Sequence, residues 1–229
     1  MQPMKAKWWK VLAIILVVYT LTAGLLFDVP RLPILNETIR ALYFHVAMWF
    51  TMLLLLTVAL VYSLRYLRTG NLKDDDMAIE FTSAAILFGM IGILTGMLWA
   101  KFTWGAYWVN DPKLNAAAIG MLMYFAYLVL RNSLVDIHQR ARIGAVYNIF
   151  AFAAFLPLIF VLPRLTDSLH PGNGGNPGFN AYDLDSKLRM VFYPAIIGWT
   201  LLGTWISTLR VRLRRAERKI EEKLINQVS

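Results

Sequence analysis

The chain has 229 residues, of which 58% are hydrophobic and 16% charged, and its mean hydropathy is +0.53. A water-soluble domain cannot bury that much apolar surface, so the bilayer must be part of its solvent. The net charge is +9 and there is no cysteine. The lack of cysteine excludes a thiol–disulfide relay, a cysteine-ligated metal and covalent cofactor attachment through a Cys-x-x-Cys-His motif.

Six apolar runs predict an all-α, polytopic membrane protein with six transmembrane helices, forming one membrane domain over residues 1–229. Most runs reach the roughly 20 residues that a helix needs to cross hydrocarbon. A β-barrel would instead show alternating apolar and polar residues over units of about 10 residues. The runs are residues 8–27, 41–64, 81–100, 115–130, 144–163 and 189–209.

The first and fourth runs differ from the others in length or in their ends. The first is too long for the core of a signal peptide, and Phe27-Asp28-Val29-Pro30 offers no small-x-small cleavage site, so we expect a retained span. The fourth run is short. We expect it to include Leu114 at one end or to let Arg131 snorkel at the other.

The basic residues are distributed unevenly between the two sides of the predicted bundle. Sixteen fall on the side of the two termini and the second and fourth connections, and seven fall on the other side. The positive-inside rule therefore predicts that both termini are cytoplasmic. The basic tail, residues 210–229, is expected to extend the last helix near anionic lipid. Juxtamembrane charge explains this tail, so no nucleic-acid partner is expected.

A tryptophan-rich segment, residues 99–115, lies on the predicted outer face and begins at Trp99. Trp104, Tyr107, Trp108 and Asp111 are spaced at i, i+3, i+4 and i+7, so a helical turn would place them on one face. Such a face can lie at the membrane edge and offer ring surfaces to a large planar ligand. The alternative is an aromatic belt, since Trp and Tyr collect at membrane interfaces.

The end of this segment carries helix signals. Pro112 disfavours helical geometry at Asp111, so the aromatic turn should end there. Asn115 is then a candidate cap for the fourth span.

Two histidines are expected on the outer face. His45 lies one turn inside the second span, where a titratable side chain indicates either a site or a hydrogen bond to a neighbouring helix. His170 precedes a glycine- and proline-rich run, residues 171–178, that cannot be regular structure. It is either a ligand or a plain loop residue. His138 lies in a basic loop on the opposite side and is expected to be solvated.

Together the two histidines suggest a specific chemistry. Two neutral imidazoles on one side can clamp a metal centre from opposite faces, and an adjacent aromatic shelf suits a flat macrocycle. This combination describes haem better than a bare ion, which needs more ligands. Basic residues that are candidates to pair with the haem carboxylates are Arg40, Lys101, Lys113 and Arg164.

The motifs Thr95-Gly-x-x-Trp99-Ala-Lys and Trp104-Gly-x-Tyr-Trp108-x-x-Asp111-Pro-Lys113-Leu closely resemble the "WWD" signature of haem-handling proteins of cytochrome c maturation. The six-span length and flanking histidines are most similar to the CcmC branch, since the CcsA branch carries extra spans. The chain departs from the CcmC pattern at Asn110, where Trp is usual, and at Lys113, where Arg often occurs.

This resemblance implies a function and a set of binding residues. The segment would hold haem b non-covalently at the outer leaflet of the bacterial cytoplasmic (inner) membrane, with His45 and His170 as axial ligands. Because the run 171–178 contains four glycines and two prolines, His170 is expected to be the ligand that is released. The other implied haem-binding residues are Trp99, Trp104, Tyr107, Trp108, Asp111 and Lys113.

The resemblance also implies partners. The haem would pass to a periplasmic haem chaperone of the CcmE type, and ABC transporter subunits of the cytochrome c maturation system are candidate partners alongside membrane lipid. No nucleophile–base pair or nucleotide-binding loop is visible, so the protein is not expected to be an enzyme.

Two alternatives remain open. A secondary transporter for another hydrophobic solute should show charged or broken-helix positions at bilayer depth, and few are seen beyond residues 88–97. A non-catalytic membrane subunit would use the tryptophans only as an anchor belt. A Soret band in the purified protein would distinguish haem binding from both.

Overall fold

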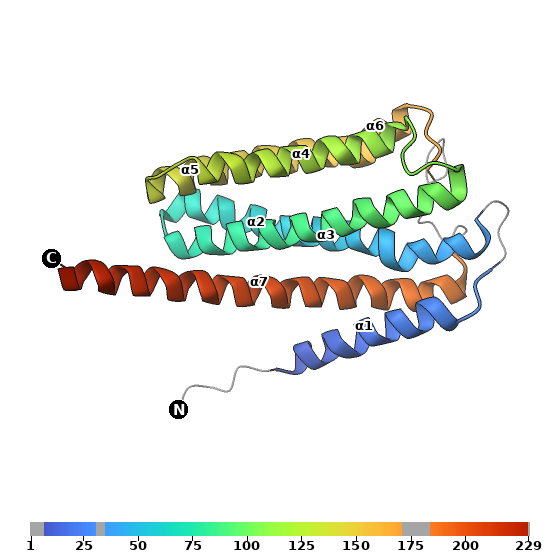
Figure 1. Ribbon diagram of the computed structural model, residues 1–229, viewed down its shortest axis with the longest axis horizontal. Helices are drawn as coiled ribbons and strands as arrows, with labels where there is room; N and C mark the ends of the chain where they lie inside the picture. The colour runs from blue at the N-terminus through green and yellow to red at the C-terminus, as the bar shows by residue number, and fades with distance from the viewer. Residues whose placement is uncertain (1–6, 31–34, 171–183, 229) are drawn as a thin grey trace.

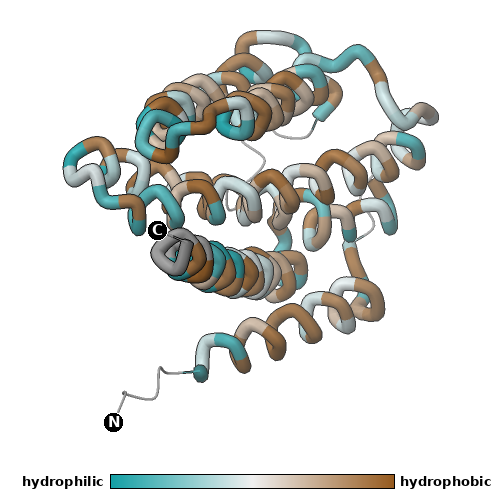
Figure 2. The backbone as a smooth tube through the Cα atoms, turned by 60° about the vertical axis from the view of Figure 1, so that its left-hand side comes forward, coloured by the Kyte–Doolittle hydropathy of each residue, from teal (hydrophilic) through white to brown (hydrophobic). Residues whose placement is uncertain are grey.

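The computed structural model describes residues 7–30, 35–170 and 184–228, apart from the side chains of 221, 222 and 225–228. All regular structure in these residues is helical. Six helical segments are long and apolar enough to cross a membrane, which confirms the predicted fold class. Figure 2 shows the apolar residues that dominate these segments. The segments are Trp8–Leu26, Asn36–Thr69, Leu72–Trp104, Pro112–Ser133, Ile137–Leu165 and Ser186–Ile220.

The helices run along the long axis of the molecule (Figure 1). A 3₁₀ turn, η1 (Asn36–Arg40), and a π turn, η2 (Leu42–Val46), precede α2 in the second span. A second π turn, η3 (Pro157–Val161), joins α5 to α6 in the fifth span. The α-helices are α1 (Trp8–Leu26), α2 (Ala47–Thr69), α3 (Leu72–Trp104), α4 (Pro112–Asn132), α5 (Ile137–Leu156), α6 (Leu162–Leu165) and α7 (Ser186–Val228).

Most helices are longer than the apolar runs that predicted them. The third run begins at residue 81, but α3 begins at Leu72. Asn71 caps this helix by accepting a hydrogen bond from the Lys73 amide. Acidic residues in the first turn stabilise it further by interacting with the positive end of the helix dipole. Hydrophobicity therefore located the part of the helix that crosses hydrocarbon, whereas a polar cap determined the residue at which the helix begins.

The main core lies between α2 and α3 and is closed by α4, α5 and α7. α1 packs chiefly against α7 at the edge of the bundle, as Figures 1 and 2 show. Many large apolar side chains of α1 are exposed, as expected for a surface that faces lipid. Buried residues of the main core include Met52, Leu55, Leu56, Phe81, Ala85, Phe88, Met121 and Tyr124.

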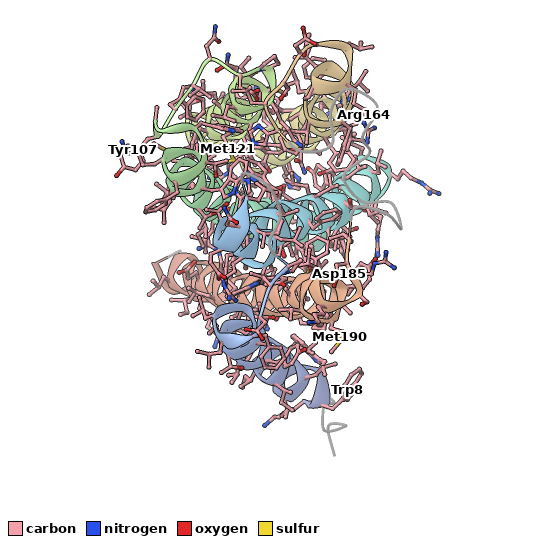
Figure 3. All side chains as sticks on the ribbon, turned by 90° about the vertical axis from the view of Figure 1, so that its right-hand side faces the viewer. Trp8, Tyr107, Met121, Arg164, Asp185 and Met190 are labelled. Carbon is pink, nitrogen blue, oxygen red and sulfur yellow. The ribbon has the colours of Figure 1, made fainter. Side chains whose placement is uncertain are left out.

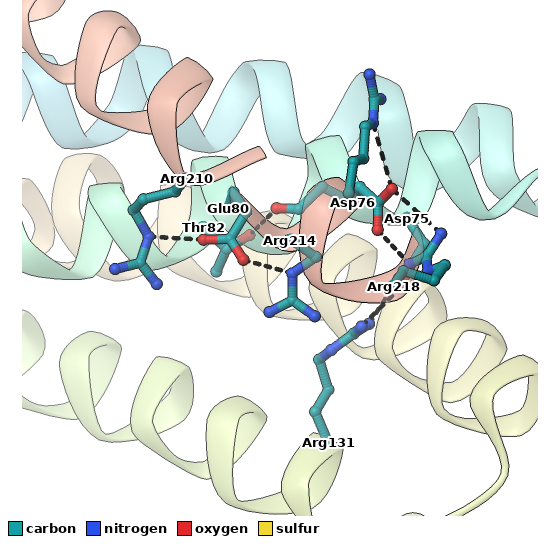
Figure 4. Close-up of polar contacts among 10 residues, drawn as sticks. Asp75, Asp76, Glu80, Thr82, Arg131, Arg210, Arg214 and Arg218 are labelled. Atoms are coloured by element: carbon teal, nitrogen blue, oxygen red, sulfur yellow. Dashed lines mark hydrogen bonds and ion pairs between the residues drawn. The ribbon is translucent and has the colours of Figure 1, made fainter. Parts of the chain in front are cut away.

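Buried ion pairs hold the N-terminal end of α3 against neighbouring helices (Figure 4). Arg131 of α4 donates to both carboxylate oxygens of Asp75, at 2.7 and 2.8 Å. The Arg131 side chain is therefore buried against a carboxylate, and the expectation that it snorkels is wrong. The fourth span gains its length instead from a helix that includes Leu114.

The basic tail continues α7 as a helix, as predicted. Its arginines, however, contact the protein itself. Glu80 accepts hydrogen bonds from Arg210 and Arg214 at 2.6 and 2.5 Å, and Asp76 pairs with Arg215 and Arg218. Four of the seven basic residues expected near lipid are thus paired with α3 (Figure 4).

Candidate functional site

A cavity of about 480 Å³ lies at the end of the bundle where the tryptophan-rich segment is found. It is bounded by η2, α2, α3, α4, α5 and the start of α7, and most of its lining is apolar. Its volume is in the range of pockets that hold small molecules and cofactors. The polar and aromatic groups that line it include His45, Trp49, Trp99, Trp108, Lys113 and His170.

His45 is presented by the π turn η2. Its Nδ1 lies 2.8 Å from the carbonyl oxygen of Gly92 on α3. A carbonyl oxygen only accepts, so Nδ1 carries the ring proton and Nε2 carries the lone pair. The predicted hydrogen bond to a neighbouring helix is therefore present, and His45 also lines the cavity.

His170 reaches the cavity from the segment after α6. Its Nδ1 lies 3.2 Å from Oδ1 of Asp111, and its ring packs against Trp104 and Trp99 with centroids 5.0 and 5.8 Å away. Burial, together with the charge of Lys113, lowers the pKa of His170 to about 4. The ring is therefore neutral at pH 7 and donates from Nδ1 to the carboxylate. The run 171–178 lies outside the described residues.

Asp111 connects two parts of the site. Its Oδ1 accepts hydrogen bonds from the amides of Lys113 and Leu114, at 2.9 and 3.3 Å, and so caps α4. Its Oδ2 accepts from Ser168 Oγ at 2.8 Å and from the Leu169 amide at 2.7 Å. Burial alone would raise the pKa of Asp111, but the hydrogen bonds from Ser168 and Leu169 bring it below its usual value.

The structure corrects the predicted cap of α4. Asp111 has the extended geometry that Pro112 imposes, with φ −117° and ψ 134°, as predicted. With Pro112 at the first helical position, Asp111 is itself the cap. Asn115 instead donates from Nδ2 to Oδ1 of Asn110 at 2.8 Å, so its prediction as the cap is wrong.

The tryptophan-rich segment is not one helical face. α3 ends at Trp104, where Gly105 adopts φ +82° as a left-handed C-cap, and the chain is non-helical up to Asp111. The expected alignment at i, i+3, i+4 and i+7 is therefore wrong. Tyr107 is 54% exposed and lies at the periphery (Figure 3), where Lys101 Nζ is 5.6 Å from its ring.

The predicted site residues thus occupy three kinds of position. Trp104 and Asp111 contact His170 without lining the cavity, and Tyr107 faces outward. Sequence reasoning missed Trp49, although its spacing of four residues from His45 is a helical signal. The five predicted residues that line the cavity are His45, Trp99, Trp108, Lys113 and His170.

The candidate partners for carboxylates also differ in position. Lys113 lines the cavity. Arg40 donates to the carbonyl oxygens of Gly24 and Phe27, and Lys101 donates to that of Gly105. Of these three residues, Lys113 is best placed to meet an anionic group inside the cavity.

This chemistry suits a macrocyclic metal complex. Across the described parts of the chain, no group of three or more His, Cys, Asp or Glu side chains is placed to hold a bare ion. Haem supplies four equatorial nitrogens itself, so two imidazoles complete its coordination. Each imidazole here has Nδ1 engaged by an acceptor, which is the usual arrangement for a metal-binding histidine.

Comparison with known proteins identifies the family of this chain. The family model described as heme exporter protein C (CcmC) matches residues 2–226. The heme exporter protein C of Bradyrhizobium diazoefficiens is 26% identical over 190 residues, which cover 81% of this chain and 71% of that protein. The Haemophilus influenzae protein of the same name is 25% identical over 189 residues, covering 78% of this chain and 72% of that protein.

A shorter similarity extends to the other branch. The cytochrome c biogenesis protein CcsA of Pelargonium hortorum is 38% identical over 79 residues, but these cover only 34% of this chain and 25% of that protein. The match to the CcmC family model extends over nearly the whole chain. The chain belongs to the heme exporter protein C family of cytochrome c maturation.

Proposed function

We propose that this protein binds haem b non-covalently in the cavity, with Nε2 of His45 and Nε2 of His170 as the axial ligands. The observation that carries the proposal is that both histidines line one cavity while an acceptor holds Nδ1 of each ring. Trp99 and Trp108 provide ring surfaces for the macrocycle, and Lys113 pairs with a haem carboxylate.

We further propose that the protein is a carrier and not an enzyme. It presents haem on the outer face of the bacterial inner membrane to a periplasmic chaperone of the CcmE type, with ABC transporter subunits as partners. The names of its relatives and the distribution of sixteen basic residues against seven support this assignment. In this orientation both termini and the paired arginines of α7 are cytoplasmic.

The two ligands have different roles in this proposal. His45 lies within a continuous helical segment, whereas His170 follows α6 and is oriented by Asp111, the residue that caps α4. A carrier must surrender its cargo, so one iron–ligand bond must break at transfer. His170 is assigned to release and His45 to retention.

The test is absorbance and resonance Raman spectroscopy on the detergent-purified protein, as isolated and after haem titration. The wild type should show a Soret band and a six-coordinate, low-spin bis-histidine spectrum. His45→Ala should lose most haem. His170→Ala should retain some haem in an altered spin state but fail to load the chaperone.

His138→Ala is the matched control, because His138 is exposed at the other end of the bundle. It should bind haem as the wild type does. An unchanged bis-histidine spectrum in His45→Ala or His170→Ala would refute the ligand assignment. A wild-type protein that stays colourless after haem titration would favour a transporter for another solute or an anchor subunit.

A further inference from the structure

Two glycines one turn apart on α3, Gly92 and Gly96, face His45 and Trp49. A Cβ atom at Gly96 would lie 2.5 Å from Cε1 and 2.9 Å from Nδ1 of His45. A Cβ at Gly92 would lie 3.0 Å from Cε2 and Nε1 of Trp49. Real side-chain contacts at 2.5 Å do not occur, so the imidazole occupies space that any other residue at position 96 would fill.

The Gly92 carbonyl adds a specific bond to this close fit. It accepts from His45 Nδ1 at 2.8 Å and also from Thr95 Oγ1 at 3.1 Å. Both bonds are additional to the helical one, because the Gly92 carbonyl also accepts from the amide four residues on in the continuous helix α3. Because this acceptor cannot donate, it selects the imidazole tautomer that is protonated at Nδ1.

The backbone that carries His45 is also unusual. Leu42–Val46 forms a π turn between the 3₁₀ turn η1 and α2. A π turn inserts one residue and so rotates the side chains before it relative to those of the following α-helix, and such turns are frequent at functional sites. The rings of His45 and Trp49 pack edge to face with centroids 6.4 Å apart, which leaves the imidazole between that indole and α3.

We propose that Gly92 and Gly96 form a seat for His45 that fixes its tautomer and ring plane. Both are positioning residues: they act on the ring through its Nδ1 and Cε1 atoms and keep the Nε2 lone pair available to the cavity. The consequence for haem ligation rests on the proposed function, whereas the effect on the imidazole does not. Glycine at position 96 leaves room for the imidazole, and glycine at position 92 leaves room for Trp49, which packs against that ring.

The first measurement needs no haem. The full-length protein, labelled with ¹⁵N in the histidine rings, is examined by NMR in detergent at pH 8, and His45 is assigned with His45→Ala. The wild type should show one tautomer protonated at Nδ1. Gly96→Ala should move His45 to a mixture of tautomers or to the Nε2-protonated form, because the ring must leave the Gly92 carbonyl.

The second measurement is haem titration of the same variants. Gly96→Ala should weaken haem binding by roughly tenfold or more, the range found when the groups that orient a ligand are removed. Its spectrum should lose the low-spin bis-histidine form, and added imidazole should restore a low-spin spectrum by ligating the iron in place of the displaced ring.

Gly198→Ala is the matched control. A Cβ at Gly198 of α7 would lie 2.9 Å from the Leu16 side chain of α1, outside the cavity lining. It strains helix packing without touching His45. It should leave the tautomer and the haem spectrum unchanged. An equal change in Gly198→Ala and Gly96→Ala would overturn the seat, because general loosening would then explain both.

Gly92→Ala keeps the test decisive if Gly96→Ala does not fold. Its Cβ would press on Trp49 and not on His45, so it should give a smaller tautomer shift in the same direction. Unchanged ¹⁵N signals in a folded glycine variant would overturn the seat. A wild-type protein that binds no haem would refute the proposed function, while a tautomer shift in Gly96→Ala would still support the seat.

Discussion

At the scale of single residues, Asp111 links the two halves of the site. One of its carboxylate oxygens caps α4 and meets the His170 ring, and the other holds the Ser168–Leu169 backbone in place. The acidic residue of the WWD-type motif is therefore not in the cavity lining. In the proposed function, Asp111 orients the ring of His170 through its contact with Nδ1.

Replacement of Asp111 should separate these two roles. Asn caps helices about as well as Asp, so Asp111→Asn should leave thermal stability near that of the wild type. When the Asn oxygen caps α4, its NH2 group replaces Oδ2 and cannot accept from Ser168 or Leu169. His170 should then lose its orientation, and haem affinity should fall by roughly tenfold. Asp111→Ala should also lose about 1 kcal/mol from the missing cap.

Haem titration and thermal denaturation in detergent measure the two effects of Asp111 separately. Wild-type haem affinity and an unchanged Raman spectrum in Asp111→Asn would show that the carboxylate does not orient the histidine.

Two tryptophans of the segment, Trp104 and Trp108, should also behave differently. Trp108 lines the cavity, so Trp108→Ala should remove ring stacking worth about 1 kcal/mol, or roughly a fivefold loss in haem affinity. Trp104 packs against His170 at 5.0 Å, so Trp104→Ala should alter the axial-ligand spectrum more than the affinity. The double change should nearly abolish binding. Full haem occupancy in the double variant would show that both rings serve only as an aromatic belt at the membrane interface.

At the scale of elements, α3 connects two functional ends. Its first turns carry the buried carboxylates that pair with α4 and α7, and its last turns carry the seat for His45 and the aromatic residues. One helix therefore anchors the bundle at one end and builds the cavity at the other. Buried ion pairs are costly to break because the remaining charge stays desolvated.

Breaking the Asp75–Arg131 pair should destabilise the whole bundle. Arg131→Met leaves the Asp75 carboxylate buried and unpaired, which should cost about 3–5 kcal/mol and lower the midpoint of thermal denaturation in detergent. The double variant Asp75→Asn, Arg131→Met should recover much of this loss, since no isolated charge remains.

Arg142→Met is the control for this experiment, because Arg142 is exposed on α5. It should change stability by less than about 0.5 kcal/mol. Equal effects of Arg131→Met and Arg142→Met would mean that the buried pair has no special role.

At the scale of the molecule, chemistry is divided between the two ends of the bundle. The cavity with its two histidines lies at one end, and the cluster of arginines and carboxylates lies at the other. This separation fits the predicted orientation, in which the cavity end faces outward and the arginine end faces the cytoplasm.

Labelling of single cysteines in this cysteine-free chain tests the orientation. Asp167 is exposed at the cavity end, and Val135 is 96% exposed in the connection between α4 and α5. An impermeant maleimide should label Asp167→Cys in intact cells, and Val135→Cys only after lysis. Labelling of Val135→Cys but not of Asp167→Cys in intact cells would reverse the topology.

The sequence by itself determined the features that depend on local pattern. Apolar runs of about 20 residues predicted six spans, because crossing hydrocarbon requires a helix of that length whatever surrounds it. A histidine in an apolar helix and the fixed spacing of the tryptophan-rich motif identified the residues of the candidate site. These signals are properties of neighbouring residues and need no knowledge of packing.

The tertiary structure decided which side chains meet. Asp111 and His170 are 59 residues apart, His45 and Gly92 are 47 apart, and Arg131 and Asp75 are 56 apart. The left-handed geometry at Gly105 ends α3 at Trp104, so Tyr107 and Trp108 do not continue the helix and the expected aromatic face does not form. Such contacts depend on the relative rotation of packed helices, and a shift of one residue turns a side chain by about 100°. Only the packed bundle therefore shows that one carboxylate orients one histidine and one glycine carbonyl orients the other.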